Sequence, residues 1–294
     1  MSNAADSSAS TSGKPARRWL YPLTWRLPII IWQAAFFIVP LAFMLLMTFW
    51  LVKNYRMEPD FITKNWVRMY TRGYFWDAYW LTLGRAALAS LVASIIAFPA
   101  SFALAFQVSD TVRRWAIFFL IIPFFTSYLV RAYAWQVILA EQGVINAMLG
   151  FVGIGPFTML NSGFGAMVGY LTLTLPLVVI LQTLSLAAVD RSLIEAAWNL
   201  GCSRLRTIAT VIIPSAKVGL IIGAVFCFIL SFGDFVSPYY LGGSKPPTLS
   251  ILIIDTTKSG QQWPRAAVVA ITMIVTLLVV AFAAIGAAYG KPRK

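Results

Sequence analysis

The chain contains long apolar stretches that carry no charged side chain. The run from Ile29 to Val52 has 24 residues without a charge, and the run from Ala86 to Ser109 is equally long. Because a helix rises about 1.5 Å per residue and the apolar core of a bilayer is about 30 Å thick, roughly 20 such residues cross a membrane. Only 11% of the residues are charged, too few to cover the surface of a water-soluble protein. The chain is therefore predicted to be a polytopic membrane protein.

Six membrane-spanning helices are expected in an all-α fold. They are placed at about residues 29–52, 84–107, 115–139, 164–188, 218–241 and 266–289. Uncharged sequence also precedes the fourth span, but its glycines, asparagines and proline are typical of turns. Residues 29–290 form the predicted transmembrane domain. Residues 1–28 form a predicted tail, whose polar opening part has too little apolar content to fold and is expected to be disordered.

The distribution of Lys and Arg predicts the orientation in the membrane. Six spans place both termini on one side. If that side is the cytoplasm, the inner segments hold 13 of the 23 basic residues and the outer loops hold 8. Cytoplasmic loops carry an excess of Lys and Arg. We therefore expect cytoplasmic termini and a cytoplasmic loop at residues 190–214, although the first outer loop is itself basic.

The composition excludes several kinds of site. The chain has no histidine and two cysteines, Cys202 in the 190–214 loop and Cys227 in an apolar run. We therefore expect no metal site and no catalytic residue of the Ser-His or Cys-His type. The sequence lacks the glycine-rich motif of a nucleotide-binding P-loop, so no cofactor is expected on this chain. The net charge of +13 is spread over loops beside apolar spans, which indicates membrane topology rather than nucleic-acid binding.

The sequence of the 190–214 loop predicts two short helices. Ser192 and Glu195 have the spacing of a capping box, in which the Ser hydroxyl accepts from the Glu amide and the Glu side chain reaches back. Gly201 stands where a residue with positive φ would end the first helix. Pro214 is expected to mark the entry to the fifth span.

Other residues of this loop suit a helix that meets a soluble partner. Asp190 adds negative charge at the helix N-terminus, which the helix dipole favours. Ala196 and Ala197 are strong helix formers with small side chains, and Ser203 can cap the second helix. The alternative is an amphipathic loop on the membrane surface whose arginines touch anionic lipid. It accounts for the arginines of the second helix, but not for a capped helix, a Gly stop and a second helix in one connector.

At these positions the loop resembles the signature of the integral membrane subunits of bacterial ABC importers. That signature is Glu-Ala-Ala, three residues, Gly, nine residues, Ile, one residue, Leu-Pro. The matching residues are Glu195, Ala196, Ala197, Gly201 and Pro214, with Val211 and Ile213 in place of its Ile and Leu. The resemblance implies a six-helix permease of the type I (MetI-like) importer fold in the bacterial inner membrane. It also implies that the 190–214 loop is the coupling element, seated in a groove of an ATPase subunit.

The same resemblance implies the partners of the chain in the lipid bilayer. They are two ATPase subunits, a second, similar permease and a periplasmic solute-binding protein. ATP would be hydrolysed by the ATPase subunits, so this chain is not expected to be an enzyme. Transport would proceed by alternating access, with closure of the ATPases turning the membrane cavity outward.

Two charges lie inside predicted spans. Arg131 lies 16 residues after Trp115, and Asp234 lies 16 residues after Val218. In straight helices both would sit about 24 Å from the cytoplasmic end, where an ionisable group is costly unless it is paired or faces a cavity. Either the two charges snorkel or pair as structural groups, or Asp234 faces the translocation path and attracts a cationic solute. Aromatic residues near that level offer cation–π faces or mark the membrane interface: Tyr128, Tyr133, Trp135, Tyr239 and Tyr240.

The surroundings of these charges resemble the polyamine (spermidine/putrescine) branch of these permeases. The similar segments are Pro123 to Trp135 with Gly143 to Asn146, and Ser231 to Pro238 with Leu241 to Gly243. The resemblance extends from about Trp32 to Gly290 and implies a small cationic solute. The candidate pathway residues are Arg131, Asp234, Tyr128, Tyr133 and Trp135.

Three alternatives remain open from the sequence. The chain could be an importer permease for another small solute, an ion-coupled secondary transporter, or a structural subunit of a larger membrane complex. A secondary transporter would use an intramembrane charge for coupling but needs no cytoplasmic docking loop. A structural subunit needs neither intramembrane charge.

Overall fold

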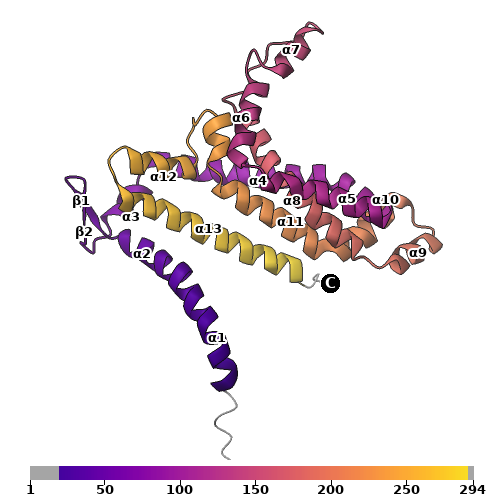
Figure 1. The fold of residues 1–294 in the computed structure, drawn as a ribbon, viewed down its shortest axis with the longest axis horizontal. Helices are drawn as coiled ribbons and strands as arrows, with labels where there is room; N and C mark the ends of the chain where they lie inside the picture. Colours follow the sequence, from indigo (N-terminus) through magenta and orange to yellow (C-terminus); the bar gives the residue numbers. More distant parts are fainter. Residues whose placement is uncertain (1–19, 291–294) are drawn as a thin grey trace, which may run out of the picture. The chain divides into compact units, whose positions relative to one another are not determined.

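The computed structural model describes residues 20–290, and residues 1–19 and 291–294 lie outside the described part. The chain divides into two compact units, residues 1–47 and residues 48–294, which we describe separately (Figure 1). The first part of the predicted tail falls on residues that are not described. Its last part, from Leu20 to Pro28, is helical and continues into the apolar run.

The first unit is a single apolar helical run. α1 (Leu20–Gln33), the π-helical turn η2 (Ala34–Ile38) and α2 (Val39–Met47) follow one another without a break. Residues Arg26–Met47 are long and apolar enough to cross a membrane. The predicted end of this span at residue 52 is wrong, because the helix ends at Met47 and the next residues pair as strands.

The second unit opens with a hairpin and a short helix. β1 (Leu51–Lys53) and β2 (Arg56–Glu58) pair antiparallel. Asn54 and Tyr55 form the turn with positive φ at both positions, as a two-residue hairpin of type I′ requires. α3 (Lys64–Tyr70) follows.

Four long helices form the body of the second unit. α4 (Gly73–Phe106), α8 (Gly163–Ala187) and α11 (Ile213–Gly233) pack against one another, and α13 (Trp263–Tyr289) packs against α11 (Figure 1). The fourth and sixth spans were predicted within a few residues of α8 and α13. The second begins at Gly73 rather than near residue 84, because its first turns, which carry Asp77 among aromatic residues, are also helical.

Small side chains allow the backbones of these helices to approach closely. Ala89, Ala93 and Ala97 of α4 are completely buried. Hydroxyls of the same helix cross-link to neighbouring backbones: Ser90 Oγ donates to the carbonyl of Ala224 at 2.6 Å, and Ser101 Oγ to that of Val179 at 3.1 Å. Small residues and interhelical hydrogen bonds are the usual means of helix association in lipid, where apolar burial gives little driving force.

The third predicted span is not a straight helix. α5 (Asp110–Ile121) and the 3₁₀ turn η3 (Ile122–Phe125) are followed by a break, then by α6 (Tyr128–Leu139) and α7 (Val144–Gly150). The two halves are bent by 92° at this break. α6 and α7 project away from the bundle as an arm (Figure 1). The helix predicted at 115–139 is therefore broken, and the depth assigned to Arg131, which assumed a straight helix, is wrong. If the bent pair is counted as one span, the described residues hold up to six candidate spans.

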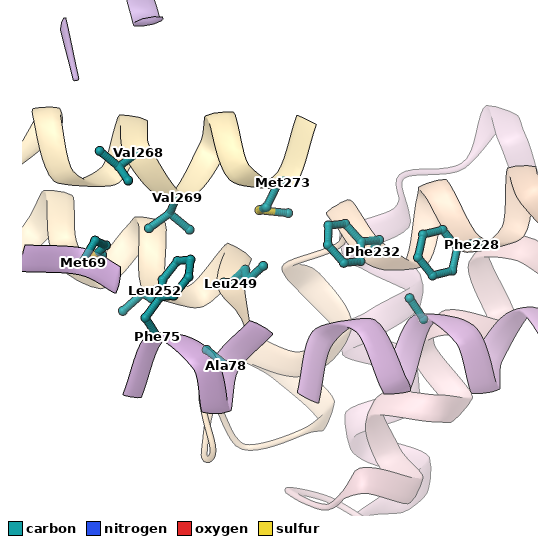
Figure 2. Packing of buried hydrophobic residues seen from close by; sticks show 11 residues of the cluster. Met69, Phe75, Ala78, Phe228, Phe232, Leu249, Leu252, Val268, Val269 and Met273 are labelled. Carbon is teal, nitrogen blue, oxygen red and sulfur yellow. The ribbon is translucent and has the colours of Figure 1, made fainter. Parts of the chain in front are cut away.

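The largest apolar cluster packs together the helices at the end of the bundle where α3 and α12 (Leu249–Lys258) lie. Figure 2 shows Phe75 of α4 and Leu252 of α12 beneath Val268 and Val269 of α13, with Phe232 of α11 farther along. A hydrogen bond from the Leu249 amide to Thr82 Oγ1, 2.9 Å long, joins α12 to α4. In Figure 1 the 190–214 loop, with α9 (Arg191–Asn199), lies at the other end.

Candidate functional site

The first candidate site is the 190–214 loop, which begins with a capped helix. Asp190 is the N-cap of α9, and its carboxylate accepts from the Ser192 amide at 2.9 Å. This backbone hydrogen bond holds the pKa of Asp190 below its usual value. The predicted capping box of Ser192 and Glu195 is therefore wrong. Ser192 already lies inside the helix, and the nearer carboxylate takes its amide.

Gly201 ends this helix in a Schellman motif, as the sequence predicted. Its φ is +78°. The Gly201 amide donates to the carbonyl of Trp198 at 2.9 Å, and the Cys202 amide to that of Ala197 at 3.0 Å. These two bonds satisfy carbonyls that the end of a helix leaves unpaired. The loop therefore has a defined helical stop rather than an irregular return.

The second helix of the loop is continuous with the fifth span. α10 (Arg204–Thr207), the π-helical turn η4 (Ile208–Ile212) and α11 form one helix from Arg204 to Gly233. Ser203 occupies the N-cap position, but its side chain makes no capping hydrogen bond. Pro214 lies at the start of α11, inside this helix. The π turn before it accommodates the missing N–H donor, so the helix runs through this position.

The loop has one buried face and one exposed apolar face. Ile194 and Ala197 are each 7% exposed and pack inward. In contrast, Leu200 and Leu205 are 85% and 80% exposed. Glu195 and Ala196 also lie on the exposed side. A cavity of about 560 Å³ lies between this loop and the end of α4; it is lined by Phe102, Phe106, Arg191, Glu195, Trp198 and Leu205, among others.

The second candidate site is a polar cluster around Asp234. α11 ends at Gly233, and a π-helical turn, η5 (Ser237–Leu241), follows. The predicted fifth span at 218–241 is thus interrupted at Asp234. The Asp234 carboxylate accepts from the amides of Val236 at 2.8 Å and of Ser237 at 3.2 Å, and from the Ser237 hydroxyl. It caps η5 in the manner of a helix N-cap.

Tyr128 brings the arm to this cap. Tyr128 is the first residue of α6, and its hydroxyl donates to the Asp234 carboxylate at 2.7 Å; it also contacts the Ser237 hydroxyl. Asp234 is only 8% exposed. Sequence reasoning missed Ser237, although an Asp followed three residues later by Ser and then Pro is a helix-start pattern.

Arg131 does not pair with Asp234. Within residues 20–290 the ion pairs are Lys53 with Glu58 and Arg113 with Asp110. The Arg131 guanidinium lies 5.6 Å from the ring centre of Tyr128 and donates to the carbonyl of Thr172 at 3.3 Å. The predicted alternative of an Arg131–Asp234 pair is therefore wrong.

The other predicted pathway residues lie apart from the carboxylate. The Tyr133 ring contacts Tyr240, with ring centres 5.1 Å apart, and Tyr240 also contacts Tyr239, at 4.9 Å. Trp135 is half-buried. The structure thus joins Tyr128 to Asp234, with Arg131 beside Tyr128, and places Tyr133 in a separate aromatic group.

Comparison with known proteins identifies the family. A model of the binding-protein-dependent transport system inner membrane component matches residues 89–291. The chain belongs to this family. It is therefore an inner membrane component of a binding-protein-dependent transport system.

Relatives and solved structures agree with this assignment. The spermidine/putrescine transport system permease protein PotB of Escherichia coli (strain K12) is 28% identical over 219 residues, which is 74% of this chain and 79% of that protein. A bacterial ABC transporter involved in the import of the acidic polysaccharide alginate has a chain of similar fold, with a TM-score of 0.75, 19% identity and coverage of 94% of this chain and 97% of that one. A bacterial alginate ABC transporter in complex with its alginate pentasaccharide-bound periplasmic protein gives a TM-score of 0.69, also at 19% identity, covering 91% and 93%. The predicted all-α, MetI-like importer permease fold is confirmed.

Proposed function

We propose that this chain is the membrane-spanning permease subunit of an ATP-driven importer that takes up a small organic cation, in particular a polyamine such as spermidine or putrescine. It works by alternating access in the bacterial inner membrane, with both termini in the cytoplasm. The solute reaches it on a periplasmic binding protein. A second, similar permease completes the pathway.

The observation that carries the proposal is the 190–214 loop. A capped helix, a Schellman stop and a second helix hold two leucines, Leu200 and Leu205, almost fully in solvent. Exposed apolar side chains on a rigid loop are typical of a surface that binds another protein. The partner on this face is an ATPase subunit, which binds and hydrolyses ATP, and the residues that meet it lie around Glu195, Ala196 and Gly201. The chain itself holds no cofactor.

The polyamine assignment rests on the similarity to PotB. Within the chain, Asp234 is the carboxylate that attracts the cationic solute. The surrounding pathway residues are Tyr128, Arg131, Tyr133 and Trp135. A permease for another small solute is the second candidate, because a closely similar fold occurs in an importer of an acidic polysaccharide. An ion-coupled carrier is disfavoured by membership of a binding-protein-dependent family.

The proposal is tested by uptake in vesicles that contain the chain, its partner permease and its ATPase subunits. Labelled putrescine and spermidine are supplied with the cognate binding protein. We expect accumulation only when ATP is inside the vesicle and the binding protein is outside. Uptake that follows an imposed ion gradient without ATP contradicts the importer mechanism. ATP-dependent uptake of a different ligand of the binding protein contradicts only the polyamine assignment.

A further inference from the structure

One end of the bundle carries a belt of tryptophan and tyrosine side chains. The belt lies on α3, the first turns of α4 and the start of α13, and consists of Trp66, Tyr70, Tyr74, Trp76, Tyr79, Trp80 and Trp263. Several of its rings contact one another, with centres 5.3 to 5.8 Å apart. Trp80 is 62% exposed and Trp263 is 49% exposed. Because Trp and Tyr collect where lipid headgroups meet water, this end lies at a membrane interface.

A cavity at this belt holds two opposite charges. Its volume is about 380 Å³, and Met69 and Tyr74 form one wall. Asp255 of α12 and Arg265 in the first turn of α13 contribute the charges. Within residues 20–290 neither takes part in an ion pair. The Nε atom of Arg265 is buried and has no hydrogen-bond partner. Neither charge is therefore neutralised by another residue of the described part of the chain.

The other polar side chains around the cavity are already engaged. Thr256 Oγ1 donates to the carbonyl of Leu252 at 2.6 Å, and Ser259 Oγ to that of Asp255 at 2.6 Å. Gln262 Nε2 donates to the carbonyl of Gly260 at 3.2 Å. The charged groups that remain for recognition in this cavity are one guanidinium and one carboxylate.

Two further positive charges lie in the surroundings of the Arg265 guanidinium. The charges of Arg68 and Arg72, at the end of α3 and just beyond it, act on Arg265. Three arginines together favour an anionic group with several oxygens, and a guanidinium matches a phosphate in two parallel hydrogen bonds. The carboxylate of Asp255 disfavours a ligand that is only anionic and favours one that also carries a cation.

We propose that this cavity binds the headgroup of a zwitterionic aminophospholipid. The phosphate lies at Arg265, in the field of Arg68 and Arg72, and the ammonium lies at Asp255. The acyl chains leave along the exposed side of the aromatic belt. The site also explains the basic residues at this end of the bundle, which run against the charge distribution expected of outer loops. It does not depend on the transported solute or on the ATPase face.

The test measures which lipids stay bound to the purified full-length chain. The purified chain is exchanged into detergent that contains phosphatidylethanolamine or phosphatidylglycerol at equal concentration. The lipid molecules that each protein retains are counted by native mass spectrometry. We expect the wild type to retain phosphatidylethanolamine preferentially. Arg265→Gln and Asp255→Asn should each lower its retention on the order of tenfold, because each removes one charged contact. Lys258→Gln, on the same helix as Asp255 but outside the cavity, is the matched control and should change nothing.

Four results would overturn the inference. Equal retention of both lipids by the wild type, unchanged by Asp255→Asn, indicates a site for anions alone. Retention that is unchanged in all variants, with weaker association of the binding protein in Arg265→Gln, indicates a protein-docking face. Displacement of the lipid by soluble phosphoethanolamine at equal concentration indicates a free solute. Loss of the preference for phosphatidylethanolamine in the folded Lys258→Gln control contradicts the location of the site in this cavity. If Arg265→Gln does not fold, Arg265→Lys takes its place.

Discussion

At the scale of single residues, Gly201 decides the shape of the 190–214 loop. Its φ of +78° lies in the left-handed region, and a Cβ added there would meet nothing within 4 Å. A substitution therefore acts through backbone conformation alone, at a cost of about 1–2 kcal/mol for an ordinary residue and less for Asn. Two variants separate this effect from side-chain bulk.

We predict that Gly201→Ala weakens the connection between ATP hydrolysis and uptake, while Gly201→Asn retains most of it. Both variants add a side chain, but Asn tolerates positive φ better than Ala. The measurement is the amount of solute taken up for each ATP hydrolysed in reconstituted vesicles. Equal ratios for Ala, Asn and wild type would remove Gly201 from the coupling element.

The Asp234 carboxylate also has a structural role, which must be separated from a role in transport. It caps η5 and accepts from Tyr128. An Asn side chain keeps one oxygen for the backbone amides but loses the negative charge, whereas Tyr128→Phe removes the hydrogen bonds of the Tyr128 hydroxyl and leaves the charge. The two substitutions therefore separate the negative charge of Asp234 from its contact with the Tyr128 hydroxyl.

We predict that Asp234→Asn lowers polyamine uptake roughly tenfold, equivalent to about 1.4 kcal/mol, without loss of complex assembly. Tyr128→Phe should lower thermal stability by about 1 kcal/mol and change uptake much less. Uptake is compared with unfolding temperature for both proteins. A parallel loss of stability and uptake in both variants would make Asp234 a structural residue rather than a pathway residue.

At the scale of elements, η5, the turn after the fifth span, packs closely against α8. A Cβ on Gly169 of α8 would lie 2.5 Å from Ser237 Oγ and 2.9 Å from Leu241 Cδ1. Both neighbours belong to η5, which the Asp234 cap holds in place. Any side chain at this position must push η5 away from the helix, and the Asp234 network moves with it.

We predict that Gly169→Ala destabilises the protein by about 1–3 kcal/mol, as overpacking does in a close-packed interior. Gly84→Ala is the matched control, since Gly84 lies in α4 with nothing within 4 Å of an added Cβ. It should be neutral or stabilising by about 0.5–1 kcal/mol, because alanine is the better helix former. Thermal unfolding of both variants in the same detergent measures the difference. Equal melting temperatures would show that η5 yields to the added methyl group.

The elements also show what sequence reasoning could and could not reach. The Gly201 stop followed from the sequence because a glycine after a short amphipathic helix has few other uses. The bend between η3 and α6 did not, because apolar content indicates that a segment suits lipid but not its direction. At that break Thr126 Oγ1 and the Thr126 amide both bond to the carbonyl of Pro123. These are local contacts that apolar periodicity does not reveal. The interruption at Asp234 was hidden in the same way by the apolar residues on both sides.

At the scale of the whole molecule, the two ends of the second unit differ in how they expose apolar side chains. The α3 and α12 end is rich in aromatic residues that pack together, whereas the 190–214 loop exposes Leu200 and Leu205 almost fully. Leucines this exposed contribute little to the fold of their own chain. They can therefore be replaced to test assembly without unfolding the subunit.

We predict that Leu200→Glu and Leu205→Glu abolish co-purification of the ATPase subunits while the chain still folds in the membrane. Their side chains are 85% and 80% exposed, so a charge there costs the isolated subunit little and costs a desolvated interface several kcal/mol.

Phe61→Glu is the control and should leave ATPase association intact, because Phe61 is 76% exposed in the segment before α3, at the other end. Ile194→Glu, at a position only 7% exposed, should lower expression and folding instead. Affinity capture of the tagged ATPase, with protein yield and thermal stability measured in parallel, distinguishes these outcomes. Retained ATPase binding in the Leu200→Glu, Leu205→Glu double variant would move the ATPase contact away from this face, and the coupling proposal would then fail even if transport itself required ATP.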